Sequence, residues 1–271
     1  MDIPYKKLSS GVKMPVLGLG TWKLKQDACT KVIQDAWHAG YRHIDTADVY
    51  QNHLDIAKGL KGASREELFL VSKLWHEEHH PDQVEPALDR ALKELQVDYL
   101  DAYLVHWPKK KGHLPDVIYK MDQMMEKGKI RTYGMCNGTI HHMQDVLNQG
   151  LKLYIHQFEL HPLFVDENII QFCQMQEIAI TAYSPLGKGE ILQHPTLVDL
   201  AKKKDRSPAQ IVLAWCLHKD FIAIPKASSP LHLEQNIASC LIRLSVKEVS
   251  LIDAINENKR LIHPDFAEFD Y

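Results

Sequence analysis

The chain of 271 residues is long enough for one large α/β barrel or for two ordinary domains. Hydrophobic residues make up 45% and charged residues 25%, which is typical of globular proteins and excludes an intrinsically disordered chain. With 32 basic and 35 acidic residues the net charge is -3, so electrostatics favours neither nucleic acid nor an anionic membrane as a partner.

No apolar run approaches the roughly 20 residues that a membrane-spanning helix requires. Residues 1–7 lack the apolar core of a signal peptide, so we do not expect export. The five cysteines are an odd number, are widely spaced and include no CxxC pair, which indicates reduced thiols in apolar surroundings. These signals together predict a cytoplasmic protein.

Short apolar runs alternate with segments of helical periodicity along the chain. Residues 5–8 and 12–15 flank Ser9-Ser10-Gly11 and predict an N-terminal β-hairpin. The predicted strands of the repeat cover residues 16–20, 41–44, 68–72, 100–105, 130–135, 154–158, 178–182 and 221–224. The predicted helices lie near residues 26–40, 50–60, 81–95, 115–126, 140–147, 166–175, 196–203, 208–218, 231 onward and 246–256.

Eight strand–helix units without a Pro-, Gly- or Ser-rich linker favour a single domain over residues 1–271. Their number favours an α/β fold of the (β/α)8 TIM-barrel type, with the hairpin at its N-terminal end and extra helices near the C-terminus. Gly18-Leu19-Gly20 continues into Thr21-Trp22-Lys23, so the G-x-G-x-x-G fingerprint of a doubly wound dinucleotide-binding sheet is absent.

Polar side chains stand at the ends of three successive predicted strands. Asp45 follows the second strand and precedes Tyr50, Lys73 closes the third strand, and His106 closes the fourth. The carboxyl ends of the strands form the catalytic rim of such a barrel, so we expect these side chains to meet. A free phenol has a pKa of about 10, and a nearby ammonium group favours its ionised form. The set therefore predicts that Tyr50 donates a proton with the help of Lys73.

Each of these residues alone is more often structural than functional, so the prediction depends on the whole set. His76-Glu77-Glu78-His79-His80 satisfies the H-E-x-x-H pattern of zinc proteases, which requires both histidines on one continuous helix. The segment directly follows a strand and is stopped by Pro81, so we predict a loop and no metal site. A phosphate-substrate isomerase is disfavoured by the tyrosine–lysine pairing and the missing glutamate base.

The chain resembles the aldo-keto reductase family over nearly its whole length. The resemblance rests on motifs that stand in the family's order: Gly18-Leu19-Gly20-Thr21-Trp22, Asp45-Thr46-Ala47-x-x-Tyr50-x-Asn52, Val71-Ser72-Lys73-Leu74-Trp75, His106-Trp107-Pro108, Gly128-Lys129-Ile130-Arg131 through Asn137, Gln157-Phe158-Glu159-Leu160-His161-Pro162, Tyr183-Ser184-Pro185-Leu186-Gly187, and Ile224-Pro225-Lys226 with Asn236. The short length is similar to that of the compact members grouped with diketogluconate reductases and prostaglandin F synthases.

The resemblance implies a monomeric cytosolic enzyme that reduces aldehydes and ketones with NADPH and no metal. Tyr50 would supply the proton, Lys73 would lower its pKa, Asp45 would orient Lys73, and His106 would position the carbonyl. Trp22, Trp75 and Trp107 would wall the substrate pocket. Cofactor contacts would come from Thr21, Asn137, Gln157, Tyr183, Ser184, Leu186, Lys226, Ala227, Ser228, His232, Gln235 and Asn236. The brief segment 108–115 and the short chain after Ile262 imply an open pocket.

Five positions depart from the family pattern. Ala227 replaces the usual serine, His232 the usual arginine and Gln235 a glutamate. Arginine clamps a phosphate through two hydrogen bonds, whereas histidine is largely neutral at pH 7, so we expect a weakened preference for NADPH and some use of NADH. His53 stands where a glutamate usually follows Asn52, and Cys136 where a serine usually precedes Asn137.

A different class of function is a regulatory barrel that binds a nicotinamide nucleotide without turnover. The intact Tyr50, Lys73 and His106 argue against it, because a pure binder has no need of a proton donor. The sequence leaves the substrate open among aldehydes, α-dicarbonyls, keto sugars and prostaglandin endoperoxides.

Overall fold

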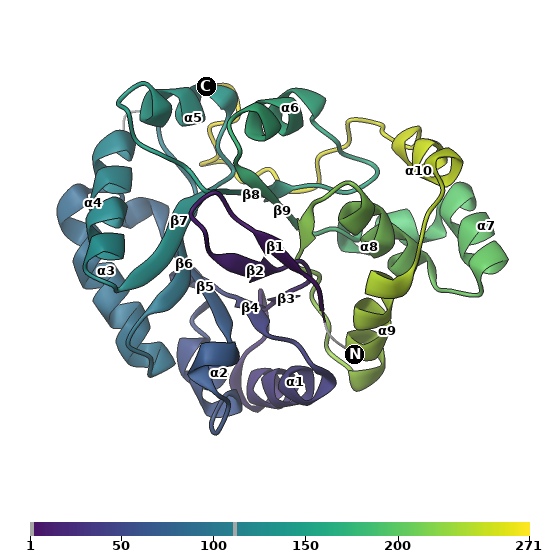
Figure 1. Ribbon diagram of the computed structural model, residues 1–271, viewed down its shortest axis with the longest axis horizontal. Coiled ribbons are helices and arrows are strands. Elements are labelled where there is room, and N and C mark those ends of the chain that lie inside the picture. Colours follow the sequence, from purple (N-terminus) through teal and green to yellow (C-terminus); the bar gives the residue numbers. More distant parts are fainter. Residues whose placement is uncertain (1–2, 111–112) are drawn as a thin grey trace.

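The computed structural model describes residues 3–110 and 113–271 and forms an eight-stranded parallel sheet of the order β10-β9-β8-β7-β6-β5-β4-β3. Leu17, just before β3, bridges Ala223 of β10 and closes the sheet into a barrel (Figure 1). The predicted (β/α)8 TIM barrel is confirmed. The strands are β3 (Leu19–Gly20), β4 (His43–Asp45), β5 (Phe69–Leu74), β6 (Leu100–Val105), β7 (Ile130–Cys136), β8 (Ile155–Glu159), β9 (Ala179–Tyr183) and β10 (Ile222–Ala223).

Helices surround the barrel on its outside (Figure 1). Several begin at capping boxes. The hydroxyls of Ser207 and Ser245 each accept a hydrogen bond from the backbone N–H of the third residue of the helix, and the side chain of that third residue accepts one from the backbone N–H of the serine. The α-helices are α1 (Gln26–Ala39), α2 (His53–Gly59), α3 (Pro81–Leu95), α4 (Leu114–Glu126), α5 (Ile140–Leu147), α6 (Glu167–Met175), α7 (Pro195–Lys204), α8 (Pro208–His218), α9 (Pro230–Ala238) and α10 (Val246–Asp253). Short 3-10 helices are η1 (Asp48–Tyr50), η2 (Arg65–Glu67), η3 (His76–Glu78), η4 (Gly187–Gln193) and η5 (Ser239–Leu241).

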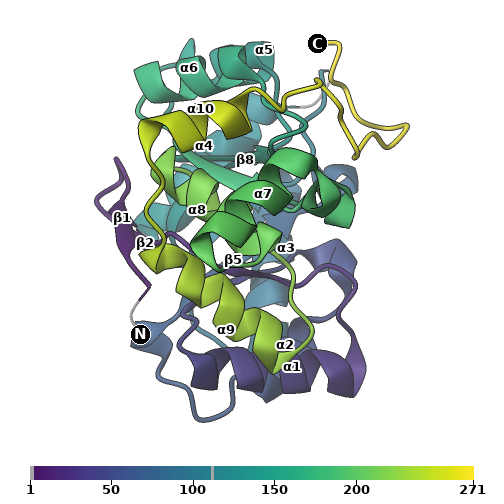
Figure 2. The ribbon, with the colours of Figure 1, turned by 90° about the vertical axis from the view of Figure 1, so that its right-hand side faces the viewer.

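The N-terminal hairpin consists of β1 (Tyr5–Lys7) and β2 (Lys13–Pro15). Lys6 Nζ donates to the backbone oxygen of Asp220, two residues before β10, at 2.9 Å. The hairpin therefore lies at the N-terminal ends of the strands, as predicted. Figure 2 shows it on one side of the molecule and the C-terminal segment, in yellow, on the opposite side.

Two boundaries at the rim differ from the predicted ones. Tyr50 does not begin the helix after β4; it ends η1, and α2 begins only at His53. Gln51 between them has a left-handed backbone (φ 55°), which prevents one continuous helix. Lys73 is not the residue after the third strand of the repeat but lies inside β5, which continues to Leu74.

The barrel strands are deeply buried, and every residue of β5 and β6 is buried. This is the expected state of parallel strands covered by helices on one face and by the barrel interior on the other. All five cysteines are buried and unpaired, and burial raises the pKa of Cys29, Cys173 and Cys216 to about 12. Within the described residues, no helix is both long and apolar enough to cross a bilayer.

Candidate active site

Three buried polar side chains lie at the C-terminal rim of neighbouring strands: Asp45 ends β4, Lys73 lies in β5, and His106 follows β6. Lys73 Nζ donates to Asp45 Oδ1 at 2.5 Å and to the carbonyl oxygen of Thr46 at 2.8 Å. The same nitrogen lies 5.3 Å from the centre of the Tyr50 ring. The ammonium group therefore sits between a carboxylate and a phenol.

Tyr50 is half-buried and faces His106 edge-on, with 5.7 Å between the ring centres. The Trp22 ring packs on Tyr50 from another direction, at 4.8 Å. The four side chains that the sequence analysis singled out thus lie together, although they come from β4, β5, the residue after β6, and η1.

Burial and ion pairing decide the protonation states of these groups. Burial opposes the charged form of Lys73, yet Asp45 outweighs it and the pKa of Lys73 is raised, so the ammonium persists. The pKa of Tyr50 is raised to about 12, because the loss of water around its hydroxyl has a larger effect than the opposing charge of Lys73. Burial and the charge of Lys73 hold the pKa of His106 well below its usual range. At neutral pH the site thus holds a protonated phenol and a neutral imidazole.

Polar groups from neighbouring strands extend the site along the rim. Gln157 Nε2 donates to Asp45 Oδ2 at 2.8 Å, and Thr21 Oγ1 donates to the Asp45 carbonyl at 2.9 Å. Asn137 Nδ2 donates to the carbonyl of His106 at 3.0 Å, and the Tyr183 hydroxyl donates to Asn137 Oδ1 at 2.7 Å. Thr21, Asn137 and Gln157, three of the predicted cofactor residues, are thus hydrogen-bonded to the catalytic candidates, and Tyr183 is linked to them through Asn137.

The segment after β9 turns sharply. Ser184 and Gly187 both have left-handed backbones, with φ of 47° and 52°. Ser184 is a non-glycine residue in that region, a conformation that costs about 1 kcal/mol or more and is concentrated at functional sites. Ser184 and Leu186 are both half-buried at the rim.

The loop between β10 and α9, together with α9 itself, holds the remaining predicted cofactor residues. Lys226, Ser228 and His232 are exposed, Gln235 is half-buried, and Ala227 and Asn236 are buried. Ser229 caps α9 by accepting a hydrogen bond from the backbone N–H of His232 at 3.3 Å. The Gly20 amide donates to the Pro225 carbonyl at 3.2 Å, so this loop lies beside Thr21 at the same rim.

Comparison with known proteins agrees with this geometry. Residues 16–257 match the Aldo/keto reductase family. The chain belongs to this family of oxidoreductases. Aldo-keto reductase family 1 member A1 of Sus scrofa is 37% identical, with 95% of this chain and 90% of that protein covered. The 9,11-endoperoxide prostaglandin H2 reductase of Trypanosoma cruzi (strain CL Brener) is 36% identical, with 94% and 92% covered.

Solved structures of aldo-keto reductases have the same fold. The enzyme of Brucella melitensis superposes with a TM-score of 0.90 at 32% identity, over 94% of this chain and 98% of that one. An enzyme from a Medee basin deep-sea metagenome library gives a TM-score of 0.92 at 27% identity, over 98% of this chain and all of the other.

The three tryptophans expected at the pocket of this aldo-keto reductase surround the site. Trp22 contacts Tyr50, while Trp75 lies 5.3 Å and Trp107 6.3 Å from the His106 ring, measured between ring centres. Half of the Trp22 side chain is exposed (51%), whereas Trp107 is buried (8%).

The C-terminal segment contacts two of the three tryptophans expected at the pocket. Phe266 packs against Trp75 at 5.5 Å and against Trp107 at 5.4 Å, and Phe269 packs against Trp107 at 5.8 Å. Sequence reasoning missed these two residues. Two aromatic residues three apart in a polar tail were the only available signal, and an irregular segment has no periodicity to say where it packs.

The H-E-x-x-H segment does not form one helix. His76 begins η3, which ends at Glu78, and α3 begins only at Pro81. The two histidines of the pattern, His76 and His80, therefore do not lie one turn apart on a continuous α-helix, as a zinc protease needs. In the described part of the chain, no cluster of three or more His, Cys, Asp or Glu side chains could hold a metal ion.

Proposed function

We propose that this aldo-keto reductase transfers hydride from NADPH to aldehydes and ketones and protonates the product from Tyr50. The observation that carries the proposal is the position of the Lys73 ammonium between the Asp45 carboxylate, at 2.5 Å, and the Tyr50 ring, at 5.3 Å, with His106 edge-on to that ring. A pure nucleotide-binding protein has no need of this arrangement.

The residues at the rim fit a nicotinamide ring. Gln157 uses only its amide nitrogen within the protein, and Asn137 makes one hydrogen bond through its nitrogen and one through its oxygen. Both side chains keep further hydrogen-bonding capacity for a carboxamide. Tyr183 is half-buried, and its hydroxyl bond to Asn137 fixes the ring as a stacking surface. When bound there, the reduced nicotinamide supplies the hydride.

The exposed loop after β10 fits the phosphate end of the cofactor. Lys226 and Ser228 offer a cation and a hydroxyl, and they stand next to the N-terminus of α9, where backbone amides favour an anion. Ser184 and Leu186, with the glycine that follows, would line the pyrophosphate. His232, Gln235 and Asn236 would face the adenosine part of the nucleotide.

The residues of this loop and of α9 also support only a weak preference for NADPH over NADH. Ala227 has no hydroxyl and the exposed His232 carries no permanent charge, so Lys226 is left as the main cation for a 2′-phosphate. Kinetics with NADPH and NADH measure this directly. A preference for NADPH above roughly a thousandfold, about 4 kcal/mol, would contradict it.

The reaction follows from the protonation states. The carbonyl oxygen gains negative charge as hydride reaches its carbon, and the neutral His106 donates a hydrogen bond that positions this oxygen. Tyr50 then gives up its proton, and Lys73 stabilises the phenolate that remains. Asp45 keeps Lys73 charged and oriented throughout.

The walls of the pocket favour apolar or aromatic carbonyl compounds. Trp22 and Trp75 provide apolar surface, and Phe266 adds to it from the C-terminal segment. The alignment with the pig protein runs over 294 positions, more than the 271 of this chain, so the relative carries insertions. The trypanosome alignment spans only 261 positions. We therefore propose a place among the compact members of the family, similar to the prostaglandin-reducing one.

We also propose that residues 1–271 form a single domain that acts as a monomer in the cytoplasm. Sedimentation or gel filtration of the purified protein checks the monomeric state, and fractionation of its cells checks the location.

The test of the proposed function is a screen of aldehydes, ketones, α-dicarbonyls and endoperoxides. Each reaction is monitored by the decrease in absorbance as NADPH or NADH is oxidised. Wild-type protein should oxidise the cofactor with at least one of these compounds. Tyr50→Phe should lower kcat by about a hundredfold or more and leave the Kd for NADPH unchanged. Tyr5→Phe removes an exposed hydroxyl and serves as the control. Binding without turnover in the wild type would instead support the regulatory barrel.

A further inference from the structure

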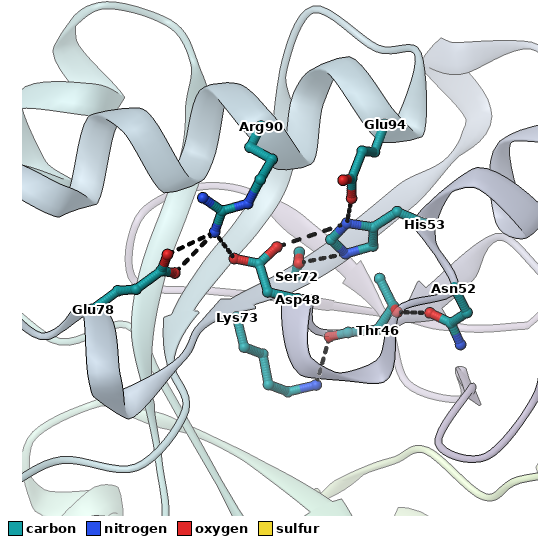
Figure 3. Close-up of polar contacts among 9 residues, drawn as sticks. All are labelled: Thr46, Asp48, Asn52, His53, Ser72, Lys73, Glu78, Arg90 and Glu94. Carbon is teal, nitrogen blue, oxygen red and sulfur yellow. Dashed lines mark hydrogen bonds and ion pairs between the residues drawn. The ribbon is translucent and has the colours of Figure 1, made fainter.

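His53, the first residue of α2, is a buried histidine that uses both of its ring nitrogens (Figure 3). Its Nδ1 lies 3.0 Å from Glu94 Oε2 on α3, and its Nε2 lies 3.0 Å from Ser72 Oγ on β5. The imidazole therefore joins a helix on the outside of the barrel to a strand of the barrel wall.

The Ser72 bond reaches the strand that carries Lys73. Successive residues of a strand point to opposite faces, so Lys73 faces the barrel interior, where it meets Asp45, while Ser72 faces outward to His53. A carboxylate only accepts hydrogen bonds, so Nδ1 of the neutral ring donates to Glu94 and Nε2 accepts from the Ser72 hydroxyl.

A second set of contacts holds the other end of the same turn. Asp48 Oδ1 lies 3.7 Å from His53 Nδ1, and Asp48 Oδ2 lies 3.1 Å from an Arg90 guanidinium nitrogen. Arg90 is held in turn by Glu78 at 2.9 Å. Tyr50 lies between Asp48 and His53 in the sequence, so the turn that presents the phenol is attached to α3 on both sides (Figure 3).

We propose that His53 is a positioning residue of the reductase: through Ser72 and Glu94 it fixes the turn of Tyr50 against the strand of Lys73. This inference rests on the proposed function. It assigns a role to the buried position after Asn52, where the family pattern has a glutamate, because a neutral imidazole there binds one acceptor and one hydroxyl at once. A displaced Tyr50 would slow proton transfer and leave the cofactor contacts of other strands intact.

The charged and titratable groups around His53 favour its neutral form. Burial lowers the pKa of His53, Glu94 raises it, and Arg90 and Lys73 lower it further. The groups that face His53 and Asp48 are Glu94 and Arg90 from α3, Glu78 from η3 and the buried Tyr103 hydroxyl from β6, and the charge of Lys73 acts on His53 from the inner face of β5.

The test compares His53→Leu, which removes both hydrogen bonds, with His53→Gln, which keeps a polar group of similar reach. His38→Leu, at an exposed histidine of α1, is the matched control. For each protein, kcat, the Kd for NADPH and the hydrogen exchange of residues 46–53 are measured. That stretch contains the Tyr50 and Gln51 amides, which donate to the carbonyls of Ala47 and Asp48.

We expect His53→Leu to lower kcat by about tenfold, because small misplacements of reacting groups cost one to two orders of magnitude. Exchange of residues 46–53 should become about tenfold faster, while the Kd for NADPH stays within about threefold. His53→Gln should recover most of both losses, and His38→Leu should equal the wild type. If His53→Leu does not fold, Ser72→Ala and Glu94→Ala remove the two bonds one at a time and should show the same pattern.

Two outcomes would overturn the proposal. One is a kcat and a local exchange rate that do not change in His53→Leu. The other is faster exchange throughout the barrel with no recovery in His53→Gln, which indicates a purely structural residue. A wild type that reduces no carbonyl compound would defeat the proposed function instead, and the exchange comparison would still decide whether His53 holds the turn.

Discussion

The two ends of the proposed cofactor site are built in opposite ways. At the tyrosine end, Asp45, Lys73 and Gln157 are at most 2% exposed and are joined by hydrogen bonds of 2.5 and 2.8 Å. At the end formed by the loop after β10, Lys226 and His232 are exposed. A buried charge depends on its protein partners, whereas an exposed one is also stabilised by water. The set of Asp45, Tyr50, Lys73 and His106 is intact at the first end, whereas His232 departs from the family pattern at the second.

The largest effect is expected where the buried end loses one charge. Asp45→Asn leaves the Lys73 ammonium buried without its carboxylate, which should cost about 3–5 kcal/mol of unfolding free energy and at least a hundredfold in kcat. Glu67→Gln breaks the partly exposed pair with Arg42, 3.1 Å long, and should cost at most about 1 kcal/mol. Denaturant unfolding measures both. Equal losses would mean that burial does not separate the two classes of ion pair.

The second effect concerns the direction of proton transfer. Reduction uses the protonated phenol, whereas alcohol oxidation needs the phenolate, and the pKa of Tyr50 is raised to about 12. The phenolate fraction grows tenfold per pH unit below that pKa. Oxidation at saturating NADP⁺ should therefore speed up by about tenfold per unit from about pH 6 to 8, while reduction stays within about threefold. An oxidation rate that is already constant near neutrality would show that Lys73 outweighs burial.

The exposed end should respond to a change of charge by a smaller factor. His232→Arg adds a permanent cation with a planar guanidinium in the first turn of α9. We expect the Kd for NADPH to fall by about tenfold, or about 1.4 kcal/mol, and the Kd for NADH to stay the same. His218→Arg adds the same charge at the last residue of α8 and should change neither value. Tighter binding of both nucleotides in His232→Arg would place the 2′-phosphate elsewhere.

The smallest expected effect concerns Asp48, the first residue of η1, and the change of protein stability with pH. Burial raises the pKa of Asp48 to about 7, although Arg90 lowers it. A raised carboxyl pKa means that the folded state binds a proton that the unfolded state has lost. Asp48 therefore contributes less to stability as pH rises from about 4 to 7.

Asp48→Asn lacks this titration. The difference in Tm between variant and wild type should therefore become more positive from about pH 5 to 8, by a few degrees or about 1–2 kcal/mol. Asp35→Asn on α1, in an exposed ion pair with Lys31, is the control and should show no such trend. A difference that does not vary with pH would mean that Asp48 is ionised throughout.

Much of this architecture is readable from local pattern. The strand count and the places of Asp45, Lys73 and His106 follow from apolar runs that end in polar residues, because parallel strands bring their carboxyl ends to one rim. Boundaries were less predictable: Tyr50 ends a 3-10 helix because of the left-handed Gln51, and neither helical periodicity nor composition marks that position.

Long-range contacts between polar residues carried no signal. Asp48 and Arg90 are 42 positions apart, and nothing local in either segment indicates that they pair. The sequence marked His53 only as a departure from a family pattern, and its two hydrogen-bond partners became known from the structure. The raised pKa of Tyr50 has the same origin, because it depends on how much water the folded barrel excludes.

The burial of all five cysteine thiols has a practical consequence for spectroscopy. Because each is buried and burial raises the pKa of its sulfhydryl, the native chain should react little with maleimides at neutral pH. A single Phe266→Cys substitution would then accept a fluorophore at one defined place beside Trp107. Quenching of that dye by the neighbouring indole would report whether the C-terminal segment stays in contact with Trp107.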